Sequence, residues 1–175
     1  MLGNNKLSAG IYLVAVATIV ALVSANTANA TKYSVCEPAK SLADVKDVKI
    51  NDCENNNEAC PFIRGFNKSI ELDFLPKEKV DQVKVKLAGK LNNLPVPFHV
   101  NPDSACGNYG FECPLEAGKA YTFKMTMPIL RTYPKINVDV VMRLLDQQGN
   151  VITCVELPAQ IREPQKEPAA ATASV

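Results

Sequence analysis

Six cysteines are the residues of this sequence with the most definite chemistry. An even number of cysteines is typical of a disulfide framework in secreted proteins. A structural zinc site would instead need close Cys-x-x-Cys pairs or histidine partners. The cysteine spacings are wide and His99 is the only histidine, so we expect three disulfides and no metal site. The six positions are Cys36, Cys53, Cys60, Cys106, Cys113 and Cys154.

The spacing of the cysteines favours one particular pairing. Two pairs enclose only six residues each and should close local loops, namely Cys53 with Cys60 and Cys106 with Cys113. The remaining pair, Cys36 with Cys154, would tie the first strand to the last. In the chain-entropy model of cross-linking, this long loop contributes most to stability, on the order of 4–5 kcal/mol.

No group of residues has the composition of a catalytic site. His99 stands between Phe98 and Val100 in a proline-rich segment, where an exposed loop residue is a better interpretation than a general base. The sequence contains no Gly-x-Ser-x-Gly nucleophile motif and no phosphate-binding glycine loop. Cysteines held in disulfides cannot act as nucleophiles. We therefore expect a protein that is not an enzyme and that needs no cofactor.

Large apolar residues occur instead in two segments that are interrupted by prolines. Val96 and Phe98 lie in the first segment, and Ile129, Leu130 and Tyr133 lie in the second. Proline cannot donate a ladder hydrogen bond, so these segments should be sheet edges or loops, with Val96 and Phe98 outside regular pairing. The side chains could simply cap the core, or they could form an apolar mouth between two sheets. Ligand pockets are mostly apolar, as such a mouth would be.

The elements that position these segments are short strands. Apolar residues alternate with polar ones in about seven places, which predicts strands that are packed on one face and hydrated on the other. A turn at residues 146–150 predicts a hairpin between the last two strands. No amphipathic helix is indicated. We expect an all-β fold, an immunoglobulin-like β-sandwich with three disulfides and an apolar pocket between its sheets. The strands are expected near residues 33–36, 45–50, 70–74, 83–87, 121–127, 136–144 and 151–157.

The two ends of the chain are expected to lie outside the folded domain. Residues 1–30 carry Lys6, an apolar run and a final Ala-Asn-Ala, the pattern of a cleaved secretory signal peptide. Residues 163–175 are rich in Pro, Ala, Glu and Lys, which predicts a disordered tail. The domain should span residues 31–162. Asn67 begins an Asn-Lys-Ser acceptor for N-glycosylation.

Charge is balanced in the part of the chain that follows the signal. Lys6 is the only charged residue before residue 31, so basic and acidic residues are then equal in number. A nucleic-acid-binding protein normally has a basic excess or a basic stripe. We expect a secreted monomer, resident outside the cell or in the lysosomal lumen, that does not bind nucleic acid.

Several motifs together resemble the ML lipid-recognition domain family, and within it the soluble Niemann–Pick type C sterol carriers. The resemblance extends from Cys36 to Ile161 and is strongest after residue 91. It is carried by Leu-Pro-Val-Pro-Phe at residues 94–98, Cys-Pro-Leu at 113–115, Tyr-Pro at 133–134 and Cys-Val-Glu-Leu-Pro-Ala-Gln-Ile at 154–161. The sequence differs from the family pattern at Val155, where the family has Trp, and at the polar pair at 92–93.

The resemblance implies a sandwich whose sheets separate to hold a lipid, with the same three disulfides. It implies that the pocket entrance is formed by Phe98, Ile129, Tyr133 and Pro134, and that Ile50 is a wall position. Val96 is added to this set from its place in the proline-rich segment. The expected partners are a sterol or fatty-acid ligand and a membrane sterol transporter or receptor.

The resulting hypothesis is a secreted or lysosomal protein that carries a sterol or fatty acid between two sheets. An alternative is an extracellular recognition protein for microbial lipids or semiochemicals. An adhesion sandwich without a ligand is the third interpretation. The nature of the bound lipid distinguishes the three.

Overall fold

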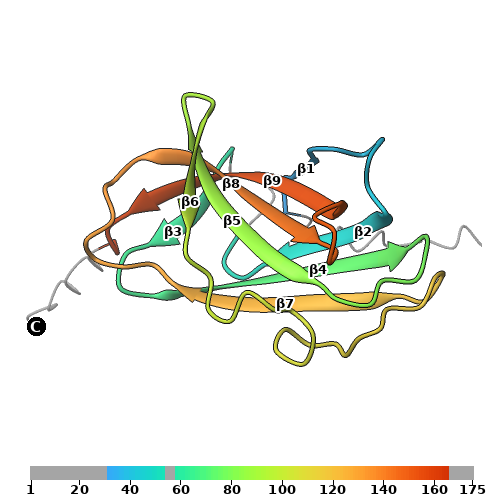
Figure 1. The fold of residues 1–175 in the computed structure, drawn as a ribbon. Helices are drawn as coiled ribbons and strands as arrows, with labels where there is room; N and C mark the ends of the chain where they lie inside the picture. Colours follow the sequence, from blue (N-terminus) through green and yellow to red (C-terminus); the bar gives the residue numbers. More distant parts are fainter. Residues whose placement is uncertain (1–30, 54–57, 166–175) are drawn as a thin grey trace, which may run out of the picture.

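A computed structural model of the chain describes residues 31–53 and 58–165. The expected signal peptide, and the expected tail beyond residue 165, lie outside the described residues. Nine strands form two packed sheets, and the described residues contain no helix (Figure 1). The strands are β1 (Ser34–Val35), β2 (Ala43–Ile50), β3 (Cys60–Ile63), β4 (Asn67–Pro76), β5 (Lys84–Leu91), β6 (Leu94–Phe98), β7 (Tyr121–Pro128), β8 (Asn137–Leu145) and β9 (Val151–Arg162).

The larger sheet has the strand order β1-β9-β8-β5-β6, and β3 also pairs with β9. The smaller sheet has the order β2-β4-β7. All strand pairs are antiparallel except β3 with β9, which is parallel. The segment from 129 to 136 carries the chain from β7 in the small sheet to β8 in the large one. This arrangement confirms the predicted all-β sandwich with three disulfides.

Alternation of apolar and polar residues explains the long strands. Along β4, Ile70, Leu72 and Phe74 are fully buried, while the residues between them are partly exposed. Phe123 of β7 is opposite Leu72 and is also fully buried. Each inward side chain of this kind removes apolar surface from water, at about 25 cal/mol per Å². The hydrophobic core therefore lies between the two sheets.

Strand β6 corrects one sequence-based expectation. Its edge position is confirmed, but Val96 and Phe98 are not outside regular pairing: they lie opposite Gly89 and Leu87 of β5. The two-residue turn Asn92-Asn93 has positive φ at both positions, as a type I′ hairpin requires. Asparagine tolerates this conformation better than most residues.

The hairpin register also explains how β6 accommodates two prolines. Leu91 and Leu94 flank a two-residue turn and form a hydrogen-bonded pair, so every second pair along the ladder is hydrogen-bonded. Pro95 and Pro97 fall on the intervening, non-hydrogen-bonded pairs. Their nitrogens therefore face away from β5, and the ladder loses no hydrogen bond. The outer edge of β6 lacks two donors as a result.

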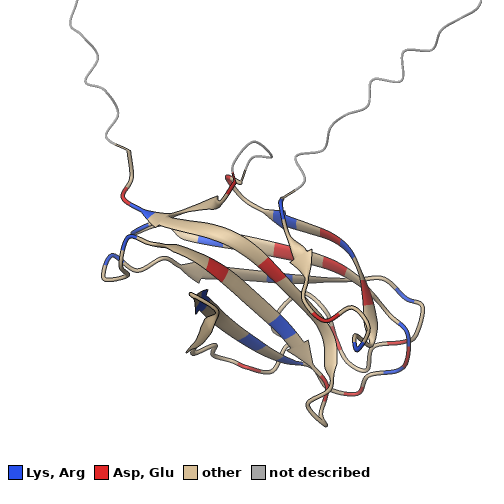
Figure 2. Ribbon diagram, turned by 90° about the horizontal axis from the view of Figure 1, so that it is seen from above, with Lys and Arg blue, Asp and Glu red and all other residues tan. Residues whose placement is uncertain are grey.

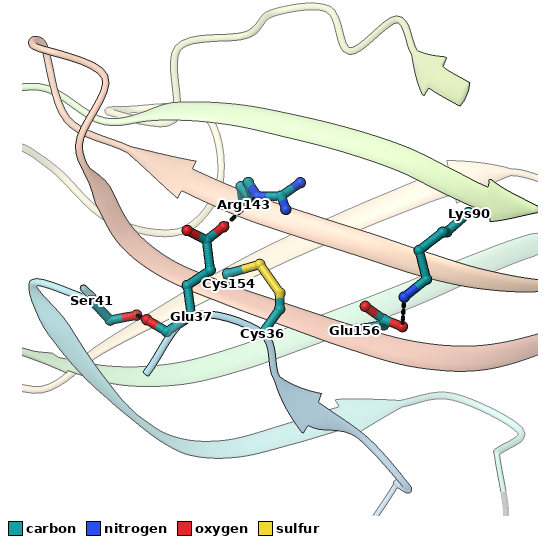
Figure 3. Close-up of a disulfide and its surroundings, with 7 residues drawn as sticks. All are labelled: Cys36, Glu37, Ser41, Lys90, Arg143, Cys154 and Glu156. Atoms are coloured by element: carbon teal, nitrogen blue, oxygen red, sulfur yellow. Dashed lines mark hydrogen bonds and ion pairs between the residues drawn. A yellow bond between two sulfur atoms is a disulfide. The ribbon is translucent and has the colours of Figure 1, made fainter. Parts of the chain in front are cut away.

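All three predicted disulfides are present. Cys36–Cys154 links the segment after β1 to β9 and lies on the outer face of the large sheet (Figure 3). Two ion pairs lie near it: Arg143 with Glu37 at 3.2 Å, and Lys90 with Glu156. The disulfide and the Arg143–Glu37 pair attach the N-terminal segment to the outer face of the large sheet, while the Lys90–Glu156 pair links β5 to β9 within that sheet.

Charged residues of both signs are interspersed along the strands (Figure 2). On the small sheet, Lys49 lies 3.4 Å from Asp73, and Lys124 lies 3.3 Å from Glu71. Exposed pairs of this kind contribute little to stability. Within the described ranges, no helix is long and apolar enough to cross a membrane.

The buried carboxylate of Asp146 organises the β8–β9 hairpin. It accepts hydrogen bonds from the backbone N–H groups of Gln148 and Asn150, each at 2.8 Å. Burial acts to raise the pKa of Asp146, but hydrogen bonds from Asn150, Gln148 and Gly149 outweigh it and lower the pKa below its usual value. The ionised form is thus the one that the folded hairpin favours.

We predict that Asp146→Ala lowers the free energy of unfolding by about 2 kcal/mol at pH 7, because two backbone donors lose a charged acceptor. Since the folded pKa is lowered, this contribution is complete above the unfolded value of about 3.9 and is lost as the pH falls through the folded pKa. Urea denaturation of both proteins between pH 7 and pH 2 measures the difference. A difference that stays constant over this range would contradict the role of the ionised carboxylate.

Candidate functional site

A cavity of about 400 Å³ opens between the two sheets at the end of the sandwich near the 99–109 and 129–133 loops. Its volume lies within the range of roughly 300–1,000 Å³ that is usual for small-molecule sites. The large sheet, β7 of the small sheet and the loops all contribute to its wall. The lining consists of Phe62, Leu87, Phe98, His99, Val100, Asn101, Pro102, Asn108, Tyr109, Met125, Thr126, Met127, Pro128, Ile129, Leu130, Tyr133, Val138, Val140 and Ile161.

The inner wall of the cavity is apolar and belongs to regular strands. Val138 and Val140 point inward from β8, and Leu87 does so from the neighbouring β5. Met125 of β7 lines the cavity from the smaller sheet. All four side chains are buried, although each borders an open space. The inner wall can therefore offer an apolar guest contacts on two opposite sides.

Two aromatic rings lie at the mouth. The ring centroids of Phe98 and Tyr133 are 6.1 Å apart and the rings are tilted by 34°. Phe98 ends the edge strand β6, and its side chain is 38% exposed. Tyr133 is partly buried, and its backbone N–H donates to the carbonyl of Leu130. The aromatic pair thus connects β6 to the β7–β8 crossover across the entrance.

The crossover is held in place by backbone hydrogen bonds to the β3–β4 turn. The N–H of Ile129 donates to Phe66 O at 2.9 Å, and the N–H of Gly65 donates to Ile129 O at 2.6 Å. Ile129 itself is buried and faces the cavity. A positive φ of 84° at Gly65 permits the tight turn that brings these groups together.

Only some of the site residues expected from the sequence line the cavity. Phe98, Ile129 and Tyr133 line the cavity. Ile50 belongs to the packed core on β2, and neither it nor Val96 or Pro134 lines the cavity. Val96 is exposed on the edge strand.

Sequence reasoning did not single out the inner wall, namely Phe62, Leu87, Met125, Val138, Val140 and Ile161. Alternation did indicate that residues such as Met125 and Val140 face inward. Alternation alone does not distinguish an inward residue that borders a cavity from one that packs against a neighbouring side chain.

Most polar side chains of the cavity lie on the 99–109 loop. His99, Asn101 and Asn108 line the cavity and are exposed at its rim. Tyr109 donates a hydrogen bond from its hydroxyl to Pro102 O at 2.7 Å, which ties the loop together. Burial, with a smaller effect of Asp103, raises the pKa of Tyr109, so its hydroxyl stays protonated at neutral pH.

No lysine, arginine, aspartate or glutamate is found among the described residues that line the cavity. The buried ammonium of Lys68 lies outside it, 5.6 Å from the centroid of the Phe62 ring, and donates to Asn51 O at 2.7 Å. Burial lowers the pKa of Lys68, opposed by the nearby Asp52. The described residues also contain no cluster of three or more metal-ligating side chains. The cavity is therefore suited to binding an uncharged apolar molecule.

Relatives with similar sequences include two insect proteins. The chain is 37% identical over 136 residues to NPC intracellular cholesterol transporter 2 homolog a of Drosophila melanogaster, covering 77% of this chain and 90% of the relative. It is 34% identical to the ecdysteroid-regulated 16 kDa protein of Manduca sexta, covering 77% and 91%.

A solved structure has the same fold. The Niemann–Pick type C2 protein of the Japanese carpenter ant superposes with a TM-score of 0.71 at 26% identity, covering 75% of this chain and 99% of the ant chain. The family model described as the ML domain matches residues 30–161, which is most of the chain. The sequence, the sandwich and the cavity between its sheets together place this chain in the ML domain family.

Proposed function

We propose that this protein carries one sterol molecule in the cavity between its sheets and transfers it between membranes or carriers. The observation that supports this most directly is the cavity of about 400 Å³, which is apolar inside and lacks charged side chains in its described lining. Relatives named as cholesterol transporters point to the same ligand class. The binding energy would come from removal of apolar surface from water.

The character of the lining favours a sterol over a fatty acid. A carboxylate that enters an apolar site must be paired or hydrogen-bonded, or its burial is costly. The described lining offers no lysine or arginine for such a pair, so a fatty-acid headgroup would have to stay in water at the mouth. A sterol hydroxyl needs only a neutral partner, and the hydroxyl of Tyr133 or the amides at the rim are of that kind.

Further features of the proposal concern the protein outside its cavity. We propose that residues 1–30 are removed as a signal peptide, that the mature protein acts as a monomer outside the cell or in the lysosomal lumen, and that residues 163–175 form a disordered tail. Asn67 is exposed at the start of β4, as a glycosylated residue must be. A membrane sterol transporter or receptor would exchange the lipid. We propose no enzymatic activity for the chain.

The experiment that tests the ligand class is extraction of the protein purified from a eukaryotic secretory host, followed by mass spectrometry of the released lipid. A sterol at close to one molecule per protein is expected. Displacement of a fluorescent sterol by unlabelled sterol, fatty acid or lipopolysaccharide ranks the classes. Preferential displacement by lipopolysaccharide would instead support the recognition protein, and absence of any bound or bindable lipid would support the adhesion sandwich.

We predict that Phe98→Ala and Tyr133→Ala each weaken sterol binding about tenfold, because each removes part of an aromatic contact surface at the mouth. Titration with a fluorescent sterol measures the dissociation constant. Phe66→Ala is the matched control, since Phe66 is an exposed aromatic residue that does not line the cavity. Equal affinities for all four folded proteins would show that the bound lipid does not contact the two rings at this mouth.

A further inference from the structure

Gly89 occupies an unusual place in the middle of β5. It lies opposite Val96 of β6 on one side and Val140 of β8 on the other, so it belongs to the row that faces the interior. Glycine inside a strand is destabilising relative to alanine by roughly 0.5–1 kcal/mol. Its φ is outside the left-handed region, so the backbone does not require glycine at this position. The reason for a glycine must lie in the surroundings.

Those surroundings are too tight for a side chain unless the neighbouring side chains shift by a few tenths of an ångström. A Cβ at position 89 would lie 3.0 Å from Cγ2 of Val138 and 3.1 and 3.2 Å from Cε2 and Cζ of Phe98. Contacts this short force the neighbouring atoms to move. The Phe98 ring lies diagonally across the strand pair, because Phe98 is opposite Leu87 while its far edge reaches Gly89. The Phe98 ring, together with the Val138 methyl group, occupies the space that a side chain at position 89 would fill.

We infer that Gly89 is a positioning residue for the cavity mouth. Because Gly89 has no side chain, the Phe98 ring can pack directly over its backbone, and we call this contact the seat of the ring. The seat holds the ring beside Tyr133, at the 6.1 Å centroid separation described above. Phe98 is 38% exposed and is the last residue of an edge strand, so it has a packed strand on one side only. The inference rests on the proposed function, because the seated ring controls how long a sterol stays bound.

A graded pair of substitutions tests the seat. Gly89→Ala should accelerate dissociation of a fluorescent sterol about threefold, and Gly89→Val about tenfold, because the larger side chain displaces the Phe98 ring further. Stopped-flow transfer of the sterol to acceptor vesicles measures the rate. Ala88→Val adds bulk to the outer face of the same strand and should leave the rate unchanged. A residue that only stabilises the strand would change the unfolding midpoint without this graded effect on dissociation.

The double variant Gly89→Ala with Phe98→Ala distinguishes a seat from a general disturbance. Once the ring is absent, only the contact with Val138 remains, so Gly89→Ala should accelerate dissociation much less than it does in the parent protein. An equal acceleration in both backgrounds would overturn the inference, and so would an unchanged rate in Gly89→Ala when Phe98→Ala alone accelerates release. If Phe98→Ala accelerates release but Gly89→Ala does not, the inference fails and the proposed function stands. If Gly89→Val does not fold, the comparison between Gly89→Ala and its double variant decides the question alone. If neither Phe98→Ala nor Gly89→Ala changes the rate, both this inference and the proposed entry site fail.

Discussion

Val140→Phe is expected to reduce sterol affinity at least 100-fold while leaving the fold intact. Val140 points into the cavity from the centre of β8 and is only 4% exposed. A phenyl ring there would occupy the space that the ligand needs. The free energy of unfolding should be unchanged or higher by about 1 kcal/mol, since filling a cavity generally stabilises a protein. Sterol titration and urea denaturation of the same preparations measure the two quantities.

Asp139→Phe is the matched control for this substitution. Residue 139 precedes Val140 on the same strand and points to the opposite face of the sheet, so the added ring cannot reach the cavity. Its sterol affinity should equal that of the parent protein. If Val140→Phe binds sterol normally and is as stable as the parent, the ligand site must lie elsewhere, and the carrier proposal loses its structural basis.

Removal of the Cys36–Cys154 disulfide by the double substitution Cys36→Ala with Cys154→Ala should lower the free energy of unfolding by about 5 kcal/mol. The bond joins residues 118 positions apart, so its loss releases a very long loop in the unfolded chain. Domains of this size are stable by only about 5–15 kcal/mol. Urea denaturation without reductant measures the change, and we expect a variant close to unfolding at 37 °C.

The local disulfide Cys106–Cys113 provides the comparison. Its partners are separated by 7 positions, and the same entropy relation gives a loss of about 2.4 kcal/mol for its removal. The two double variants should therefore differ about twofold in their destabilisation. Equal losses would mean that strain or native-state packing, and not loop length, determines the effect of these cross-links.

The sequence predicted the long strands well, because their alternation is decided by local burial. The strands β4, β7 and β8 each place apolar residues on the core side at every second position, and β9 does so from Val155 onward. Alternation in the sequence did not predict β3, because its four residues are nearly all buried and include a proline. That strand forms because β9 offers a parallel partner about one hundred residues further along the chain, and no local pattern encodes this pairing.

The candidate site was predicted in part. Prolines marked two irregular segments, and the family resemblance selected Phe98, Ile129 and Tyr133, which the structure brings to one cavity. Ile50 illustrates the opposite case: it lies in the packed core on β2, away from the lining. Whether an inward residue meets a void or a neighbour depends on how far apart the two sheets lie, which is a property of the whole sandwich.

The prolines of β6 have a consequence for whatever exchanges lipid with this protein. Many recognition surfaces bind an extended segment of a partner by β-augmentation, which needs a row of free backbone donors on the receiving edge. Pro95 and Pro97 remove those donors from the strand that ends at the cavity mouth. A lipid donor or acceptor that docks along this edge must therefore be selected by side chains and shape, and cannot be captured by main-chain complementarity there.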